Sequence, residues 1–419
     1  MKARLAVIEF PGTNDITTVV KAAKKANIEA VVYRWNEKEL DFSSFDAYVL
    51  AGGFSFQDRS RGGIIAALDP LMEKLKSEDA KGKPILGINN GAQILLEAGL
   101  VPGFDRYEVA GSCAPNLQLV DNTVLDASFY HATVFVKPLN SSLFFENTVI
   151  EGYIGTTEGR FVFEPEVLKM LYENKVAMLQ YCDFEGTVAQ EFPTNPTGSM
   201  DNLAAIGNHK GNVLASMVQP KPPALSQMLL AMVTNKKLKS SFVPFTLPSR
   251  APSKSIRQAT QKDAELIVGT AITDDTSLSV EKRLHLMGIA VRIQRFIHWE
   301  IGKQENASAK QWEADVATAK KSFELYNHNK EYLLQTLPSS DLAFLTRCSA
   351  TEDALGRKTA QVLQKHYGIT TFASLRHSVL WLLTVDENAT FDKEEVIEKA
   401  LATNIFNNPI SHWREHYEH

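Results

Sequence analysis

The chain has 419 residues, of which 44% are hydrophobic and 22% are charged, and its mean hydropathy is −0.16. This length exceeds what one ordinary core accommodates, so it predicts two or three domains. The net charge of −5 and the isoelectric point near 6.1 argue against nucleic-acid binding. No apolar run approaches the roughly 18 residues of a membrane span. We therefore expect neither nucleic acid nor a membrane as a partner.

The cysteines and the N-terminal segment indicate the compartment. Cys113, Cys182 and Cys348 are odd in number and far apart, which fits neither a disulfide framework nor a zinc site. The apolar run near the N-terminus is interrupted at Glu9 and Pro11 with no cleavage site after it, so it predicts a strand and not a signal peptide. We expect a cytoplasmic protein with no metal and no cofactor.

The first roughly 240 residues alternate short apolar runs with amphipathic stretches, a pattern typical of a doubly wound α/β sheet. Helices are predicted over Asn14–Asn27 and Gly62–Ser77, with Asn14-Asp15 and Ser60 as caps. A hairpin or meander within 105–190 is expected to add antiparallel strands. The remaining strands are predicted at Arg4–Glu9, Ala30–Tyr33, Ala47–Ala51, Pro84–Ile88, Thr133–Val136, Val176–Tyr181 and Val213–Met217.

A stretch rich in Pro and Ser, at 244–255, has no apolar period and marks a domain boundary. We predict a first domain at 1–242, a linker at 243–260 and an α+β domain at 261–419.

The second domain contains a weak internal repeat, aligned on the Gly-Ile pairs at Gly288 and Gly368. Both copies, at about 262–337 and 340–419, read β-α-β-α, the half-ferredoxin order. Chance similarity between two βαβ units is the alternative. The first copy comprises strand 265–271, helix Leu278–Met287, strand Val291–Ile301 and helix Trp312–Leu337. The second comprises strand Leu342–Arg347, helix Leu355–Tyr367, strand Ser374–Thr384 and helix Lys393–Phe406.

The segment 83–100 is the most informative part of the chain. It predicts a buried strand, a tight turn between Gly87 and Gly91, and a helix, which is the geometry of a nucleophile elbow. The residue at the turn is Asn89. A carboxamide cannot add to a carbonyl as a thiolate or alkoxide does. The scaffold of a reactive site is therefore present without its nucleophile.

A glycine pair follows the predicted third strand. Gly52 and Gly53 allow backbone N–H groups to approach a ligand closely, and with the N–H of Asn90 they suit an oxyanion hole. The plainer interpretation is that the glycines only form a turn.

Four sequence blocks together resemble the glutaminase subunit of phosphoribosylformylglycinamidine synthase, a class I glutamine amidotransferase. The blocks are Gly52–Ser55, Gly87–Gln93, Asn195–Asn208 and Gly211–Ala215, and the resemblance covers 3–230. It implies a flavodoxin-like fold and a glutamine pocket. The implied substrate-binding residues are Gly52, Gly53, Phe54, Asn90 and Gln93.

The resemblance also implies a Cys-His-Glu triad, and all three positions have changed. Asn89 stands at the Cys position, Gln219 replaces the His, and Lys221 stands where the Glu is expected. An engineered Cys-to-Asn change alone would explain Asn89 but not the other two. Because nucleophile and base act as a unit, we expect no catalytic residue here.

A substitute nucleophile has no clear signal either. Cys113 and Cys182 do not follow a strand-turn-helix pattern, and Ser55 has no identifiable base. A family segment of the type His-Gly-Glu-Gly-Arg-Phe aligns with 156–161, where the His is lost. Its Arg160 either faces a partner domain or caps a loop.

The C-terminal domain resembles the small bridging subunit of the same synthase, with Phe406-Asn-Asn-Pro409 comparable to its closing turn. That subunit works as a dimer, so two tandem copies would form one complete bridge. The His-rich segment 411–419 is interpreted as a polar tail and not as a set of metal ligands.

These resemblances predict an accessory subunit of the synthase in de novo purine biosynthesis, with an inactive glutaminase domain. The chain contains no Gly-x-x-x-x-Gly-Lys-Ser/Thr loop, so the ATP-binding synthetase chain would be a separate partner. In this hypothesis free ammonia supplies the nitrogen. One alternative keeps glutamine as a bound, unhydrolysed signal. The other is a repurposed interaction protein outside purine synthesis.

Overall fold

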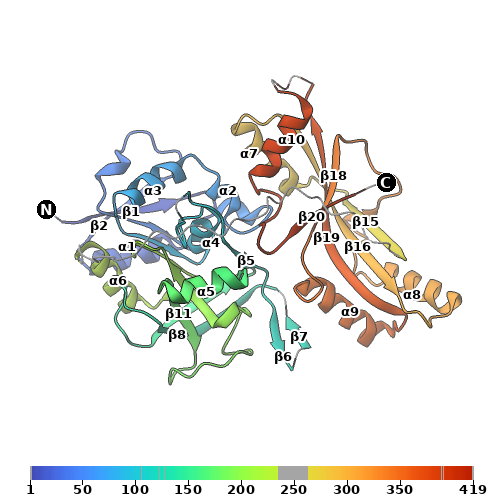
Figure 1. Ribbon diagram of the computed structural model, residues 1–419, viewed down its shortest axis with the longest axis horizontal. Coiled ribbons are helices and arrows are strands. Elements are labelled where there is room, and N and C mark those ends of the chain that lie inside the picture. Colours follow the sequence, from blue (N-terminus) through green and yellow to red (C-terminus); the bar gives the residue numbers. More distant parts are fainter. Residues whose placement is uncertain are drawn as a thin grey trace. The chain divides into compact units, whose positions relative to one another are not determined.

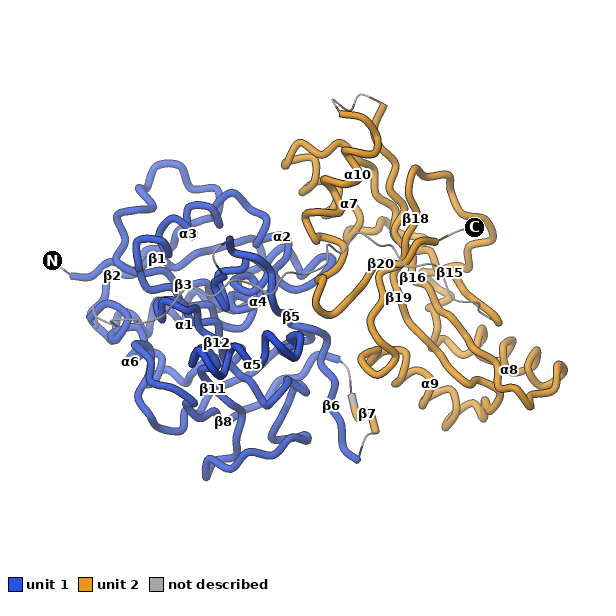
Figure 2. The backbone as a smooth tube through the Cα atoms, viewed as in Figure 1, with its two compact units in different colours: residues 1–122, 128–250 blue, residues 123–127, 251–419 orange. Residues whose placement is uncertain are grey.

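The computed structural model describes residues 2–104, 106–121, 123–126, 128–234, 263–387, 389 and 391–417. The chain forms two compact units (Figure 2). Unit 1 comprises Met1–Asn122 and Ser128–Arg250, and unit 2 comprises Thr123–Ala127 and Ala251–His419. The predicted linker at 243–260 lies outside the described residues, so its position stays a prediction.

Unit 1 is built on a ten-stranded sheet with the order β14-β9-β8-β11-β12-β13-β4-β3-β1-β2. Figure 1 labels β1, β2, β8 and β11 of this sheet. Strands β13, β4, β3, β1 and β2 are parallel, and their order is that of the flavodoxin-like doubly wound fold. The parallel strands are β1 (Arg4–Glu9), β2 (Glu29–Arg34), β3 (Ala47–Leu50), β4 (Ile85–Ile88) and β13 (Val213–Ser216). The predicted α/β class is confirmed.

An antiparallel half extends this sheet, as the prediction for 105–190 required. It consists of β8 (Tyr130–Pro138), β9 (Ile150–Thr156), β11 (Ala177–Cys182), β12 (Leu203–Gly207) and β14 (Gln219–Pro220). A separate pair is formed by β5 (Gly111–Ala114) and β10 (Arg160–Phe163), and β6 (Gln118–Val120) is a further short strand.

Helices cover both faces of the parallel strands, so residues of β1 are buried on both sides. Leu5 and Val7 pack in one core with α1 and α6, whereas Ala6 and Ile8 pack in the other with α3, α4 and α5. The helices are α1 (Ile16–Lys25), α2 (Ile64–Ala67), α3 (Leu71–Ala80), α4 (Asn90–Glu97), α5 (Pro165–Glu173) and α6 (Pro222–Thr234).

Two local predictions in unit 1 are wrong. The single helix expected over Gly62–Ser77 is divided into α2 and α3, because Pro70 lacks an N–H and begins a new helix. Ser60 is not a cap, since the N-cap of α2 is the left-handed Gly63. Asp15 is the N-cap of α1, but its side chain makes no capping hydrogen bond.

Unit 2 contains a six-stranded antiparallel sheet with the order β17-β15-β16-β19-β18-β20. Its strands are β15 (Ala264–Thr270), β16 (Val291–Lys303), β17 (Glu331–Leu333), β18 (Leu342–Arg347), β19 (Phe372–Val385) and β20 (Trp413–His416). Its helices are α7 (Asp275–Leu286), α8 (Ala309–Lys321), α9 (Ala354–Tyr367) and α10 (Lys393–Ala402), and β7 (Thr123–Asp126) also belongs to this unit.

The two copies of the repeat occupy opposite halves of this sheet. From its edge inward the first copy contributes its third, first and second strands, β17, β15 and β16. The second copy follows the same order from the other edge, with β20, β18 and β19. At the centre of the β16–β19 pairing, His298 lies opposite Ser378. These residues follow Gly288 and Gly368 at the same separation along the chain. The predicted pair of β-α-β-α copies is confirmed, each with one more short strand at its end.

Three predictions in unit 2 are wrong. The helix expected to reach Leu337 ends at Lys321, and Phe323 just beyond it has a left-handed backbone. Helix α10 ends at Ala402, before the left-handed Asn404. The expected polar tail instead contains β20, which pairs with β18, and its residue Glu415 is buried. Within the part of the chain that the structure describes, no helix is long and apolar enough to cross a membrane.

Candidate functional site

The strand, turn and helix predicted around Asn89 are present. Strand β4 ends at Ile88, Asn89 has φ 51° and ψ −112°, and α4 starts at Asn90. This conformation is strained for a residue other than glycine, and the Asn89 N–H anchors it by donating to the Ser216 carbonyl at 2.7 Å. Gly91 permits the tight turn, because a Cβ there would lie 2.1 Å from the Leu50 carbonyl oxygen. The elbow geometry is therefore formed in full.

The Asn89 side chain is held in place by strand β9, which is not adjacent to β4 in the sheet. Its Nδ2 donates to the Gly155 carbonyl on β9 at 2.7 Å. A Cβ on Gly52 would lie 3.4 Å from Asn89 Cβ and 2.4 Å from Asp15 Oδ2. The loops after the first and third strands thus meet at the elbow, as expected for the carboxyl edge of such a sheet.

Gln219 and Lys221, the other two positions at which the resemblance implies triad members, also lie against β9. Gln219 pairs with Tyr153 in the β14–β9 ladder, and Lys221 forms an ion pair with Glu151. Hydrogen bonding to Glu151 raises the pKa of Lys221, so this residue is a cation where a carboxylate was expected. The three positions therefore present two carboxamides and an ammonium, and none is a base for a nucleophile.

Asn90 and Gln93 organise a buried polar network beside the elbow. Asn90 Oδ1 accepts from the Ser55 N–H at 2.9 Å, and its Nδ2 donates to Asp58 Oδ1 at 3.0 Å and to Gln93 Oε1 at 2.8 Å. Gln93 Nε2 donates to the Glu158 carbonyl at 2.7 Å. Both side chains therefore tie the loop after β3 and the turn before β10 to α4.

Two carboxylic acids in this network have unusual proton affinity. Burial raises the pKa of Asp58 to about 7 and that of Glu158 to about 7. Glu158 Oε2 also accepts from the Gly62 N–H at 2.7 Å. Sequence reasoning gave Asp58 no role, because nothing in its neighbours along the chain indicates that the carboxyl group packs against α4.

Aromatic side chains line the outer side of the loop that follows β3. The exposed fraction of Phe54 is 38%, and its ring centroid lies 6.2 Å from that of Phe129. Phe56 instead packs on Phe10 and Trp35. Of the predicted substrate-binding residues, Phe54 is thus the exposed one, while Asn90 and Gln93 are buried.

The residues considered as substitute nucleophiles lie in unsuitable positions. Cys113 on β5 and Cys182 on β11 are buried in strands, and burial raises the pKa of both thiols, which disfavours the reactive thiolate. Ser55 Oγ is buried and makes no hydrogen bond within the described residues. Arg160 is buried and its Nε donates to the Pro115 carbonyl at 2.9 Å, which supports the loop-capping interpretation.

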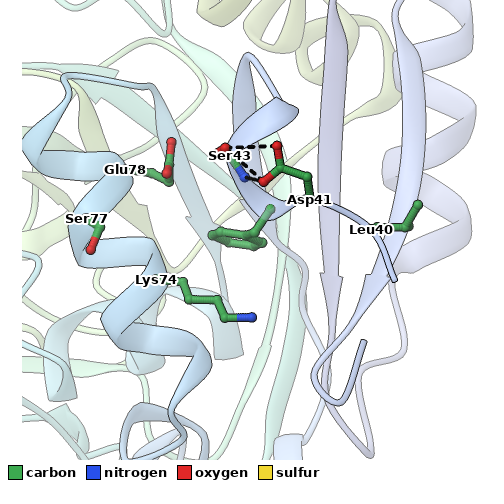
Figure 3. A pocket seen from close by; sticks show the side chains of 7 residues that line it. Leu40, Asp41, Ser43, Lys74, Ser77 and Glu78 are labelled. Atoms are coloured by element: carbon green, nitrogen blue, oxygen red, sulfur yellow. Dashed lines mark hydrogen bonds between the residues drawn. The ribbon is translucent and has the colours of Figure 1, made fainter. Parts of the chain in front are cut away.

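A surface pocket elsewhere in unit 1 does not provide an alternative site. It has a volume of about 360 Å³ and lies between the turn at Phe42–Ser44 and α3 (Figure 3). Asp41 already accepts hydrogen bonds from Ser43, and Glu78 pairs with Lys81 and Lys83. The residues that line the pocket are Leu40, Asp41, Phe42, Ser43, Lys74, Ser77 and Glu78. The acidic groups are satisfied within the chain and leave little to recognise a ligand.

Unit 2 buries a polar chain at the centre of its sheet. His298 Nδ1 lies 2.9 Å from Ser378 Oγ, and its Nε2 lies 3.0 Å from Glu265 Oε2. The order of groups resembles a hydrolytic triad, but His298 and Ser378 are both buried. The Tyr417 hydroxyl also donates to Glu265. This chain of contacts joins the two copies of the repeat and is not open to a substrate.

The fold and the elbow together define a glutamine amidotransferase domain. The CobB/CobQ-like glutamine amidotransferase family matches residues 2–239. Among its relatives, the phosphoribosylformylglycinamidine synthase subunit PurQ of Methanothrix thermoacetophila is 36% identical over 226 residues, covering 52% of this chain and 86% of the relative. The PurQ of Methanocaldococcus jannaschii is 33% identical, covering 58% of this chain and 98% of the relative. Through its first unit the chain belongs to this family of PurQ-type glutamine amidotransferases.

Two solved structures also match part of the chain. A structure of PurLQS from Thermotoga maritima matches with 25% identity and a TM-score of 0.43, covering 57% of this chain and all of that one. A glutamine amidotransferase from Thermotoga maritima matches with 13% identity and a TM-score of 0.30, covering 52% of this chain and 76% of the other. These matches, like the relatives, span little more than half of this chain.

Proposed function

We propose that this chain is an accessory subunit of phosphoribosylformylglycinamidine synthase in de novo purine biosynthesis, with a catalytically inactive glutaminase domain. The observation that carries the proposal is the intact elbow with Asn89 at its tip, its side-chain amide bound to the Gly155 carbonyl. The relatives that match the first unit are named as subunits of that synthase.

The chemistry of the three altered positions supports inactivity. Glutamine hydrolysis by this class needs a nucleophile that attacks the carboxamide carbon and a base that takes the nucleophile's proton. Asn89 offers no titrating proton, Gln219 cannot act as the base, and Lys221 is engaged as a cation by Glu151. Restoring one position alone would leave the other two defects in place.

Unit 2 fits the role of a bridge within the complex. Its two repeat copies form one continuous sheet, which is what two copies of a small dimeric subunit would form if fused in tandem. The partner in this proposal is a separate ATP-dependent synthetase chain. That chain would make formylglycinamidine ribonucleotide from the formylglycinamide ribonucleotide, ATP and free ammonia.

A second candidate function is glutamine sensing. It is favoured by the residues retained beside the elbow, namely Gly52, Gly53 and the exposed Phe54, with Asn90 and Gln93 behind them. Glutamine would bind there without reaction and report nitrogen status. Titration calorimetry with glutamine, in the presence and absence of the synthetase chain, tests this directly. The absence of heat in both titrations would remove this candidate.

The experiment that tests the main proposal measures product formation by the synthetase chain with ammonium as nitrogen donor. We expect the rate to rise when this chain is added. An unrelated protein at the same concentration controls for nonspecific stabilisation of the synthetase. An equal rate with and without the chain would contradict an architectural role and favour an interaction protein outside purine synthesis.

A further inference from the structure

The loop that follows β1 is bound to the glycine pair that follows β3. The Gly52 carbonyl accepts from the N–H groups of Asn14 at 3.0 Å and Asp15 at 3.1 Å. The Phe54 N–H donates to the Gly12 carbonyl at 2.9 Å. These backbone hydrogen bonds fix the start of α1, and with it the Asp15 side chain, against Gly52.

The Asp15 carboxylate is an acceptor without a donor. Its Oδ2 lies so close to Gly52 that a Cβ on this glycine would be 2.4 Å away. Although Asp15 is the N-cap of α1, its side chain makes no capping hydrogen bond. Burial raises the pKa of the Asp15 carboxyl, and among the described residues no cation or hydrogen-bond donor offsets this loss of water. The carboxylate is therefore left to be satisfied by solvent or by a ligand.

Asn89 presents a second acceptor beside the first. The same Cβ on Gly52 would lie 3.4 Å from Asn89 Cβ, so the Asp15 and Asn89 side chains border one side of Gly52. Because Asn89 Nδ2 donates to the Gly155 carbonyl at 2.7 Å, the other end of the amide, Oδ1, remains as an acceptor. None of the residues that the structure describes donates to this oxygen. Asp15 and Asn89 are both partly exposed, so both are open to solvent.

The charge at this place is the opposite of what glutamine hydrolysis requires. Attack on a carboxamide builds negative charge on its oxygen, and an oxyanion hole stabilises that charge with hydrogen-bond donors. A carboxylate against Gly52 repels such an oxygen. Lys221 does not compensate, because its ammonium group pairs with Glu151. The groups beside the elbow therefore suit a ligand that carries positive charge and N–H donors.

We propose that the Asp15 carboxylate and Asn89 Oδ1 form a binding site for an ammonium group, supplied by the free ammonium ion or by a small amino acid. An ammonium group offers one positive charge and only donors, which matches one negative charge and two acceptors. Only the choice of the free ion as the natural source rests on the proposed function, in which ammonia is the nitrogen donor. The elbow then holds the kind of nitrogen that its lost triad no longer releases from glutamine.

Nuclear magnetic resonance of the full chain, without a synthetase, tests the site directly. Two matched pairs of solutes are titrated below neutral pH and at equal ionic strength. Ammonium is compared with tetramethylammonium, and glycine with trimethylglycine, since the methylated member of each pair keeps the charge but has no N–H donor. We expect saturable shifts of the Asp15 carboxyl carbon and the Gly52 amide with ammonium or glycine and not with the methylated solutes. Tighter binding of ammonium assigns the site to the free ion, and tighter binding of glycine assigns it to an amino acid.

Three variants locate the binding. Asp15→Asn removes the negative charge at nearly constant size, loses no capping hydrogen bond, and should weaken binding at least about tenfold. Asn89→Ala removes the second, uncharged acceptor and should weaken binding by a smaller factor. Glu166→Gln, an exposed change on α5, is the matched control and should bind as the unaltered chain does.

A lack of saturation with both ammonium and glycine, equal shifts with the methylated solutes, or unchanged binding in Asp15→Asn would overturn the proposal. The pKa of Asp15 in the unaltered chain gives a readout that needs no variant. Bound ammonium should lower this pKa, because a nearby positive charge favours the ionised carboxyl, and a pKa that ammonium leaves unchanged contradicts the site. Since no synthetase is present, these measurements can fail while the accessory role stands, and the accessory role can fail while the site binds.

Discussion

Units 1 and 2 both bury polar side chains, but they bury them in different parts of the sheet. In unit 1 the buried polar groups, such as Asn90 and Gln93, lie at the strand ends around an elbow. In unit 2, His298 and Ser378 lie at the middle of the two longest strands. The strand ends of a doubly wound sheet form the crevice where ligands bind, whereas the middle of a sheet is closed by neighbouring strands. Similar residue types therefore surround the elbow in one unit and join two repeats in the other.

The largest effect on stability is expected from removing the buried cation of unit 2, Arg347. Arg347 Nη2 donates to Glu300 Oε2 at 2.7 Å, and its Nε lies 3.6 Å from Glu415 Oε1. Arg347→Met leaves two buried carboxylates without their cation, which should cost about 3–5 kcal/mol in the free energy of unfolding. Urea denaturation measures this loss. The matched control is Arg292→Met, whose exposed pair with Asp386 should contribute no more than about 0.5 kcal/mol. Equal losses in the two variants would show that the contacts of Arg347 with Glu300 and Glu415 do not stabilise unit 2 more than an exposed ion pair does.

The two units should also respond to pH in opposite directions. Burial lowers the pKa of His377 to about 4, so its neutral form stabilises unit 2 fully above pH 6.5 and this contribution is lost as the pH falls toward 4. The loss amounts to up to about 3 kcal/mol. Asp58 and Glu158 act in the opposite sense, weakening unit 1 as the pH rises through about 7. Hydrogen exchange resolved by peptide, between pH 4.5 and 7.5, separates the two responses. His377→Gln should remove the acid-side loss, and an unchanged loss in that variant would assign it to other groups.

A smaller effect is expected from Asn90, which is the centre of the polar network in unit 1. Asn90→Ala leaves the Ser55 N–H and Asp58 without their partners and should cost about 1–3 kcal/mol. Its comparison is Gln219→Ala, on the edge strand β14, where a loss within about 0.5 kcal/mol is expected. Thermal unfolding compares the two. A larger loss at Gln219 than at Asn90 would contradict the view that the Asn90 network stabilises the fold around the elbow.

The smallest effect is expected at Lys221. Its ion pair with Glu151 is partly exposed on both sides and is screened by solvent. Lys221→Met should therefore leave the urea midpoint unchanged within error at about 0.1 M salt. A clear destabilisation would show that the pair has a structural role that its exposure does not suggest.

Much of the parallel sheet could be predicted, because the apolar runs of β1, β3 and β4 are continuous and end at turn residues. The repeat of unit 2 was also visible, since Gly288 and Gly368 mark equivalent turns. The division of α2 from α3 at Pro70 was readable from the chain but was missed. The end of α8 was harder, because the stretch after Lys321 remains compatible with a helix until β17 pairs with β15.

The elbow was predictable from the sequence, whereas the contacts around it were not. The elbow and its Asn89 follow from the local spacing of glycines around a buried run. The network that joins Asp58, Asn90 and Glu158 depends on contacts between residues far apart along the chain. No local pattern reports such contacts, so the packing of the two acids could not be inferred from the sequence. The ion pair between Lys221 and Glu151 was hidden for the same reason.

The measurement that tests the central claim most directly is the release of labelled ammonia from glutamine that carries ¹⁵N in its side-chain amide. The chain is assayed together with the proposed synthetase partner, and Asn89→Ala serves as the comparison. We predict no release above the uncatalysed background for either protein, while ammonium still supports product formation. Release that depends on this chain would contradict the inactive glutaminase domain, and its loss in the Asn89→Ala variant would locate the activity at the elbow.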